Sequence, residues 1–220
     1  MKNHEIDFMH LGGRIQELLY DYVAVQSITN TPAERGVEEF FQKYIRGIEY
    51  FSQNPEYWGL YPVENDGLDR NVCWAMVRGE GERTVVLVHH YDVVDIEDYK
   101  TLKPFAYTPD QLCAELKKHM DMLPEDAEQD LKSGNFLFCR GGCDMKGGGA
   151  IQYALLEAYS RLPEFRGNVV VIGVPDEENL SAGMRGAARL LAELQEKYGL
   201  RYVMMINSEP HQRKDFSRGV

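Results

Sequence analysis

The stretch Asn168–Val174 restricts the fold of this chain more than any other part of the sequence. It reads Asn-Val-Val-Val-Ile-Gly-Val, and a β-branched run without polar alternation is typical of a strand that is covered on both faces. Apolar residues at helical spacing lie before it, over residues 151–158, and after it, over residues 184–198. A further apolar run at residues 202–206 predicts one more buried strand. Strands that alternate with helices in this way predict an α/β fold: a three-layer sandwich with a mostly parallel central sheet covered by helices on both faces.

The N-terminal part of the chain predicts two amphipathic helices. The spacing of apolar residues places the first over residues 11–23. The second has a marked start, because Thr31 and Glu34 have the spacing of a capping box and Pro32 occupies the first helical position. Its apolar stripe runs over residues 37–48 and is expected to be buried.

Short β-type runs fill much of the remaining sequence. Four of them predict strands at residues 57–63, 71–77, 84–89 and 136–139. The polar segment between the last two, residues 95–135, is broken by three prolines and contains two short helical patterns, at residues 111–120 and 125–132. This segment is therefore expected to be a long connection within one domain.

Composition and charge exclude several classes of protein. The chain has 24 basic and 35 acidic residues, and its net charge of −11 has the wrong sign for tracking nucleic acid or an anionic membrane surface. No apolar run approaches the roughly 18 residues that a membrane span requires. The N-terminus is acidic where a secretory signal needs basic residues, and the four cysteines form no Cys-x-x-Cys pair. We therefore expect reduced thiols and a cytoplasmic protein.

Candidate functional residues follow the predicted strands at the points where these strands end. In open α/β sheets, ligands bind outside the carboxyl ends of the strands. Four predicted strands are each followed by a histidine or by carboxylates: His90 and Asp92, then Asp144, then Asp176, Glu177 and Glu178, then Glu209. Carboxylates gathered at one edge repel each other, and a bound divalent cation is the simplest way to hold them together.

Each of these features also has a simpler interpretation when it is taken alone. A single His-x-Asp after a strand is most often a surface loop, and the pair Glu177-Glu178 is typical of a solvated turn. The glycines at 147–149 form neither a Walker loop nor a dinucleotide-binding fingerprint. Cys139 and Cys143 are more typical of small buried hydrophobes than of metal ligands. The combination is more specific than its parts, because spacing, position and residue type agree.

Four motifs occur in order along the chain: His90-x-Asp92-Val-Val, Arg140-Gly-x-x-Asp144-Met-Lys-Gly-Gly, Asp176-Glu177-Glu178 and Ser208-Glu209-Pro210. Over about residues 10–210, this series resembles the zinc exopeptidase superfamily that contains aminoacylase, carboxypeptidase G and succinyl-diaminopimelate desuccinylase. The Val-Val-Asp-x-Glu-Asp-Tyr stretch after the histidine, and the long insert at residues 112–135, are most similar to the branch called arginine utilisation protein.

The resemblance implies a set of metal ligands. It makes His90, Asp144 and Glu209 the ligands of one metal, with Asp144 bridging to a second metal that Glu178 also binds. Imidazole and carboxylate groups suit zinc. The implied cofactor is therefore two zinc ions per complete enzyme, with cobalt or manganese as substitutes.

The resemblance also implies roles for residues that are not ligands. Glu177 is then the general base, and Asp92 holds the second ring nitrogen of His90. A cis peptide bond between Asp144 and Met145 is expected as well.

From these roles we expect a dinuclear zinc metallopeptidase or amidohydrolase that cleaves amide bonds in small N-acylated amino acids or short peptides. Arginine metabolism is suggested by the branch resemblance only. The rival hypothesis is a catalytically inactive binding or assembly module that keeps the exopeptidase fold.

The resemblance further implies that residues 1–220 form a single catalytic-type α/β domain that is incomplete. Superfamily members continue with a lid and dimerisation domain and with a segment that supplies the last metal ligand. We accordingly expect this chain alone to be inactive. The expected partner is a small-molecule or short peptide substrate, with no nucleic acid and no membrane, and a homodimer of the complete protein is left open.

Overall fold

The computed structural model describes residues 8–162 and 164–210. At its centre lies a five-stranded sheet in the order β1-β2-β4-β3-β5: β1 (Trp58–Pro62), β2 (Asn71–Arg78), β3 (Arg83–His90), β4 (Asn168–Val174) and β5 (Arg201–Asn207). The β4–β3 and β3–β5 pairings are parallel, whereas the β1–β2 and β2–β4 pairings are antiparallel. The predicted α/β class is confirmed, with a mixed sheet whose parallel half holds β3, β4 and β5.

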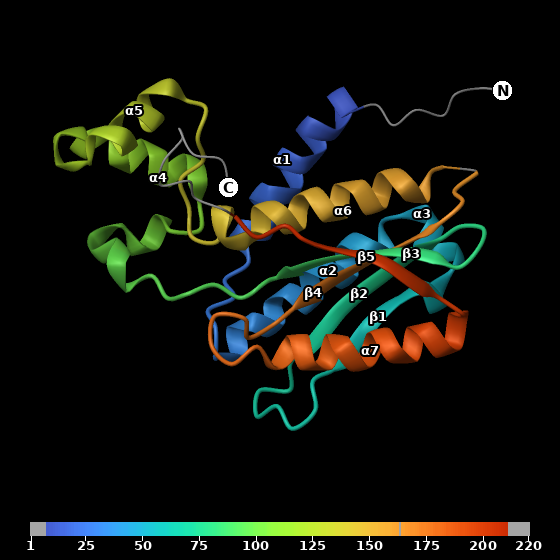
Figure 1. The fold of residues 1–220 in the computed structure, drawn as a ribbon. Coiled ribbons are helices and arrows are strands. Elements are labelled where there is room, and N and C mark those ends of the chain that lie inside the picture. The colour runs from blue at the N-terminus through green and yellow to red at the C-terminus, as the bar shows by residue number, and fades with distance from the viewer. Residues whose placement is uncertain (1–7, 163, 211–220) are drawn as a thin grey trace, which may run out of the picture.

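Helices cover both faces of this sheet (Figure 1). Their bounds are α1 (Phe8–Ala24), α2 (Gly36–Arg46), α3 (Glu49–Gln53), α4 (Pro109–Leu116), α5 (Glu125–Ser133), α6 (Gly147–Ser160) and α7 (Ala182–Tyr198). α1, α2 and α6 lie over one face and α7 lies over the other, which gives the three expected layers. α4 and α5 belong to the long connection before α6 and stand to one side of the sheet. None of the helices in the described ranges is both long and apolar enough to span a bilayer.

The central strand β4 shows why the sequence produces three layers. All seven of its residues are buried. Because successive side chains of a strand point to opposite faces, Val169 and Val171 pack into the core beneath α1, α2 and α6. Val170, Ile172 and Val174 pack into the core beneath α7. An uninterrupted apolar strand is therefore what a sheet covered on both faces requires.

The start of the second helix follows the prediction only in part. Thr31 caps it as expected, since its hydroxyl oxygen accepts from the Ala33 backbone N–H at 3.3 Å. The first turn, Pro32–Arg35, is a 3-10 helix that leads into α2. Glu34 does not close the capping box on Thr31. Its carboxylate instead accepts from the Asn30 backbone N–H at 2.7 Å, and the residue is completely buried.

Residues 136–139 do not form the predicted strand. They run as an irregular segment, and the Arg140 N–H that follows them donates to the Ala106 carbonyl at 2.8 Å instead of to a strand of the sheet. The run Phe-Leu-Phe-Cys has β propensity, but a strand also needs a partner. β4 is already paired on both sides, by β2 and by β3.

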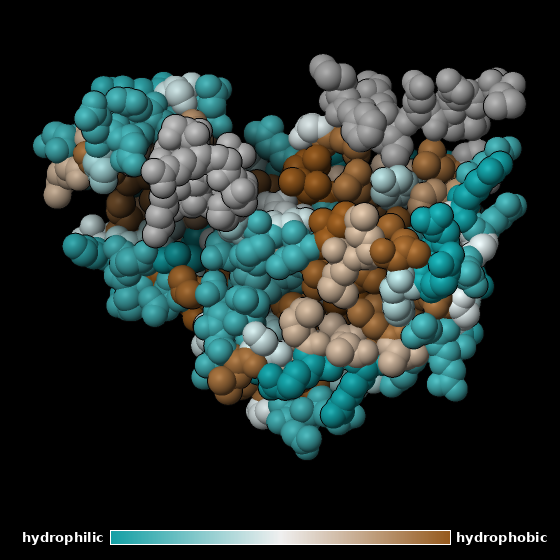
Figure 2. Space-filling model, in the orientation of Figure 1, coloured by the Kyte–Doolittle hydropathy of each residue, from teal (hydrophilic) through white to brown (hydrophobic). Residues whose placement is uncertain are grey.

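β5 departs from the prediction in its burial. The sequence predicts a buried strand, but six of its seven residues are exposed. β5 is the edge strand beside β3, and Met204 remains 56% exposed. Figure 2 shows hydrophobic side chains gathered at the surface where β5 and α6 face the viewer. The apolar sequence of β5 requires a cover that the described residues do not supply.

Candidate metal centre

His90 is the last residue of β3 and is buried, with one ring nitrogen held by its own loop. Its Nδ1 lies 3.0 Å from the Asp92 carbonyl oxygen and 3.5 Å from the Asp92 carboxylate. These acceptors place a proton on Nδ1, so Nε2 is the ring nitrogen that is available to a metal. Histidines that bind metals are commonly oriented in this way, by a carbonyl or carboxylate behind the ring.

The free nitrogen of His90 faces two carboxylates that come from distant parts of the chain. Its Nε2 lies 2.9 Å from Asp144 Oδ1 and 3.7 Å from Glu209 Oε1. One potential ligand atom from each of these three residues lies within 4.8 Å of the others. The Asp144 and Glu209 side chains are 55% and 39% exposed, so the group is open to solvent on its carboxylate side. The peptide bond between Asp144 and Met145 is cis, as the resemblance implies.

The loop after β4 brings Glu177 and Glu178 to the same place. Glu177 Oε2 lies 3.8 Å from His90 Nε2. The backbone N–H groups of Glu177 and Glu178 donate to Asp92 Oδ1 and Oδ2, each at 3.0 Å. The fully buried Asp92 carboxylate therefore links the histidine to the glutamate loop.

Glu178 is placed less closely than its expected role as a ligand suggests. It is not among the residues whose ligand atoms meet within 4.8 Å, although burial and then the charge of Asp144 raise the pKa of its carboxyl. We call His90, Asp144, Glu177, Glu178 and Glu209 the metal-site cluster.

The electrostatics of the metal-site cluster show an excess of negative charge. Burial alone would lower the pKa of His90, but hydrogen bonding to Asp92 and the nearby carboxylates raise it to about 9. Burial raises the pKa of Glu209, and the charge of Asp144 raises it further, against the opposing effect of His90. Burial would also raise the pKa of Asp92, but hydrogen bonds from His90 and Glu177 hold it below its ordinary value.

One imidazole nitrogen facing several carboxylates is a donor set that zinc and similar divalent cations bind in proteins. The residues present therefore fit the metal that the resemblance implies. His90, Asp144 and Glu209 are placed to hold a first ion, and four carboxylates around one histidine supply the negative charge that such an ion would neutralise.

A buried chain of polar groups, which none of the sequence motifs predicts, supports the segment that carries Glu209. The Gln152 amide on α6 donates to Ser208 Oγ at 2.9 Å and to the Val88 carbonyl at 2.8 Å. Its oxygen lies 2.9 Å from Nδ1 of His89, a histidine that points to the opposite face of β3 from His90. Gln152 belongs to no motif, so only its polarity on a buried helix face could have identified it.

The glycines at the start of α6 are explained by close packing. A Cβ at Gly148 would lie 2.6 Å from Ser208, and one at Gly149 would lie 2.6 Å from the His89 ring. These distances are too short for any side chain. The absence of a phosphate-binding pattern in the sequence agrees with this packing role.

Lys146, the basic residue of the same motif, is also used by the fold. It is fully buried, and its amino group donates to the carbonyls of Val25 and Tyr22 at 2.6 and 3.3 Å. These carbonyls lie at the end of α1, where backbone acceptors lack helical partners. Lys146 thus fastens α1 to the segment that carries Asp144.

The cysteines do not contribute to the metal-site cluster. Cys139 and Cys143 are free thiols, and neither belongs to a group of potential ligands found among residues 8–162 and 164–210. Cys139 is half-buried and Cys143 is exposed, so the interpretation of both as small buried hydrophobes is wrong for Cys143.

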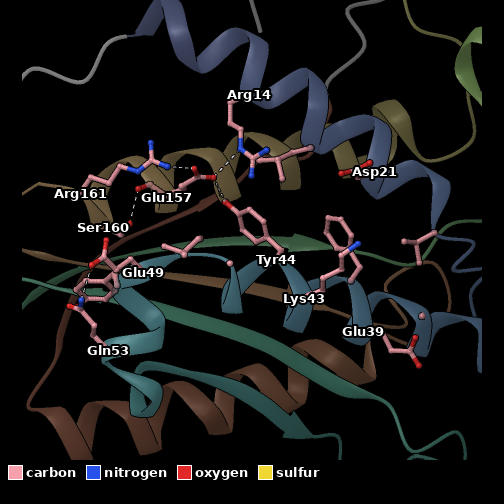
Figure 3. A pocket seen from close by; sticks show the side chains of 17 residues that line it. Arg14, Asp21, Glu39, Lys43, Tyr44, Glu49, Gln53, Glu157, Ser160 and Arg161 are labelled. Carbon is pink, nitrogen blue, oxygen red and sulfur yellow. Dashed lines mark hydrogen bonds and ion pairs between the residues drawn. The ribbon is translucent and has the colours of Figure 1, made fainter.

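A cleft of about 1040 Å³ lies at the other end of α6, between that helix, α1 and α2 (Figure 3). Three of its charged side chains pair with one another at the α6 end. Arg14 Nε lies 3.0 Å from Glu157 Oε2, the Tyr44 hydroxyl donates to the same oxygen at 3.2 Å, and Arg161 pairs with Glu157 as well. Glu157 is thus compensated by two guanidinium groups.

Comparison with known proteins shows which family and which relatives the chain resembles. A model of Peptidase family M20/M25/M40 matches residues 116–217. The chain is 37% identical over 194 residues to "Uncharacterized protein YqjN" of Bacillus subtilis (strain 168). The aligned region covers 88% of this chain and 35% of that protein. It is 31% identical over 212 residues to "Protein RocB" of the same organism. That aligned region covers 95% of this chain and 37% of that protein. The chain thus spans just over a third of the length of these relatives.

Solved structures share the fold at low sequence identity. Human carnosine dipeptidase 1 superposes with a TM-score of 0.58 at 18% identity, over 93% of this chain and 41% of that one. The M20 family metallo-carboxypeptidase Sso-CP2 from Sulfolobus solfataricus gives a TM-score of 0.54 at 15% identity, over 88% and 37% of the two chains. The likeness to these structures shows the fold.

The fold and the family match together describe an α/β domain that is similar to Peptidase family M20/M25/M40. The resemblance carried by its motifs is confirmed.

Proposed function

We propose that this chain carries the metal-binding and proton-transferring residues of a hydrolase of amide bonds in small N-acylated amino acids or short peptides. One observation carries the proposal: ligand atoms of His90, Asp144 and Glu209 lie within 4.8 Å of one another. Two proteins of similar fold, a dipeptidase and a metallo-carboxypeptidase, support short peptide substrates. An arginine-related substrate rests on the branch resemblance of the sequence.

The proposed division of labour follows from the geometry of each side chain. His90 Nε2, Asp144 and Glu209 would hold the first ion. A second ion would be held by Asp144 and Glu178, as the motif resemblance implies. When bound, zinc, or cobalt or manganese in its place, lowers the pKa of the attacking water and polarises the substrate carbonyl.

Glu177 is the general base in this scheme. Its side chain is 44% exposed and its Oε2 lies 3.8 Å from His90 Nε2, so it borders the ligand atoms and still reaches solvent. It takes the proton of the attacking water and delivers it to the leaving amine. Asp92 keeps the His90 ring in place through Nδ1 and holds the Glu177 backbone with the same carboxylate.

Zinc titration of the chelator-treated chain by calorimetry tests the proposal. We expect one tight site, because three protein ligands are the usual number for a catalytic zinc, and a much weaker second site that has only Asp144 and Glu178. We expect negligible turnover of an N-acyl amino acid by this chain alone. The absence of zinc binding would favour the inactive binding module instead, and two equally tight sites would show a ligand that the scheme lacks.

The variant Glu177→Gln separates the base from the ligands. If Glu177 only transfers protons, zinc affinity should stay within about threefold of the wild-type value, because the ligand atoms are unchanged. Loss of the tight site in this variant would contradict the assignment of the two adjacent glutamates.

A further inference from the structure

A second charged cluster lies behind the loop that carries Glu177 and Glu178. It consists of Arg70, Asp66, Glu34 and Asp176, and we call it the Arg70 cluster. The side chains of these four residues are at most 5% exposed. Asp176 belongs to the Asp176-Glu177-Glu178 motif of the sequence, and the proposed function gives it no role.

One guanidinium joins three carboxylates that come from separate segments. Arg70 Nη1 lies 2.6 Å from Glu34 Oε1 and 2.9 Å from Asp176 Oδ1. Its Nη2 and Nε contact the Asp66 carboxylate at 2.6 and 3.0 Å, in a two-pronged arrangement. The turn before α2, the loop before β2 and the loop after β4 are thereby tied to a single side chain.

Asp176 also restrains both ends of the loop after β4 that carries Glu177 and Glu178. Its backbone N–H donates to Glu34 Oε2 at 3.0 Å, and its φ of +67° lies in the left-handed region. At the far end of the loop, the Ala182 N–H donates to Asp176 Oδ2 at 3.0 Å and the Ser181 N–H donates to the Asp176 carbonyl at 2.6 Å. The loop is therefore closed on Asp176, and Arg70 and Glu34 hold Asp176 in place.

Between these fixed ends stand Glu177 and Glu178, whose N–H groups point to the Asp92 carboxylate. The loop thus has two anchors: Asp92 beneath its middle and the Arg70 cluster at its ends. Arg70 itself contacts no residue of the metal-site cluster among its recorded hydrogen bonds.

We propose that the Arg70 cluster is a positioning device: through Asp176 it fixes the loop that presents Glu177 and Glu178, so that Arg70 and Glu34 act on the metal site without touching it. The functional consequence rests on the proposed function, whereas the control of the loop does not.

Hydrogen exchange of backbone amides in the zinc-free chain tests the control of the loop. Arg70→Lys keeps the charge but loses the two-pronged geometry, and Asp176→Asn keeps an acceptor but loses the charge. In both variants we expect the amides of Glu177, Glu178 and Ala182 to exchange about tenfold faster, since each is held by a hydrogen bond to a carboxylate. Amides of β4 and of the middle of α7 should exchange at wild-type rates.

The matched control is Glu157→Gln, which weakens a partly buried ion-pair network at the far end of α6. It should leave the loop amides unchanged. Equal rates in the loop of Arg70→Lys and of the wild-type chain would overturn the proposal. A uniform rise over the whole chain would also overturn it, because a purely structural role would then suffice.

Zinc titration of the same variants tests the consequence for the site. The tight site uses no residue of the loop and should keep its affinity within about threefold, whereas the weaker site should lose about tenfold through Glu178, an effect of the size expected for groups that orient a ligand. A wild-type chain that binds no zinc would refute the proposed function, and the exchange rates would still decide the role of Arg70.

Discussion

The metal-site cluster and the Arg70 cluster solve the same electrostatic problem in opposite ways. Each gathers several carboxylates near the carboxyl end of the parallel strands. The Arg70 cluster contains its own cation, and its side chains are at most 5% exposed. The metal-site cluster has only His90 as a counter-charge, and the Asp144, Glu177 and Glu209 side chains are 55%, 44% and 39% exposed.

This difference in exposure and counter-charge separates carboxylates that stabilise the fold from carboxylates that are available to bind a ligand. Arg70 holds the pKa of Asp66 below its ordinary value through hydrogen bonds, and hydrogen bonds from Ala182, Asn179 and Arg70 outweigh burial to do the same for Asp176. One guanidinium cannot fully compensate three buried carboxylates, so burial raises the pKa of Glu34 to about 7. A site that binds an external cation needs exposed carboxylates that no internal cation such as Arg70 already neutralises.

The largest effect is expected when the internal cation is removed. Arg70→Met leaves three buried carboxylates without their partner, and breaking a buried ion pair on one side costs about 3–5 kcal/mol. Urea unfolding of the zinc-free chain should show a loss of unfolding free energy of this size. A loss below about 1 kcal/mol would mean that the Arg70 cluster does not stabilise the fold as an ion-pair network.

The next effect is a pH dependence that Glu34 alone should produce. Its pKa of about 7 in the folded chain lies above the ordinary value of 4.5, so the folded state binds more protons between these values. The contribution of Glu34 to stability is thus fully present below about pH 4.5 and is lost as the pH rises through about 7, by about 3 kcal/mol in total. Urea unfolding of the wild-type chain and of Glu34→Gln over this range measures it. As the pH rises, the unfolding free energy of the wild-type chain should fall relative to that of Glu34→Gln. A difference that does not change with pH would contradict the raised pKa of Glu34.

A smaller effect, seen only with metal, is expected for the metal-site cluster. His90→Ala removes the nitrogen ligand, and zinc affinity at the tight site should fall by about 100-fold or more, the upper range for residues that merely orient ligands. Calorimetric titration measures it, with Arg201→Met at the exposed Arg201–Glu82 pair as a control that should bind zinc normally. Retention of tight binding by His90→Ala would remove the basis of the proposed site.

The smallest effect sharpens the contrast between the clusters. Asp144→Asn neutralises a carboxylate that is half exposed, and in zinc-free buffer the unfolding free energy should change by no more than about 0.5 kcal/mol. The same substitution should remove tight zinc binding. A large loss of stability without zinc would place Asp144 among the residues that serve the fold, beside Asp176.

The parts of the site that could be predicted from the sequence are those set by local patterns. His90, Asp92, Glu177 and Glu209 follow strands whose apolar runs are visible in the sequence, and parallel strands bring their carboxyl ends to one edge. The fold class was predictable for the same reason, since the apolar run at residues 169–174 of β4 requires cover on both faces.

The parts that could not be predicted depend on contacts between distant segments. The spacing of Glu34 after Thr31 is that of a capping box. No local pattern predicts that Glu34 instead pairs with Arg70, which lies 36 positions further along the chain. The run at residues 136–139 has strand propensity, but it pairs with no strand of the sheet. β5 has the sequence of a buried strand. Such a pattern predicts that a strand is covered, but it does not predict which segment covers it.

The glycines at the start of α6 bear on how this sequence can vary among its relatives. At Gly148 and Gly149 even a methyl group would collide with Ser208 or His89, whereas at Gly12 and Gly13 on α1 it would meet nothing within 4 Å. Selection for folding alone therefore preserves the first pair and leaves the second free to drift. A relative that had lost its chemistry would still carry the glycine signature, so this motif identifies the fold, and only the carboxylates and the histidine can identify an enzyme.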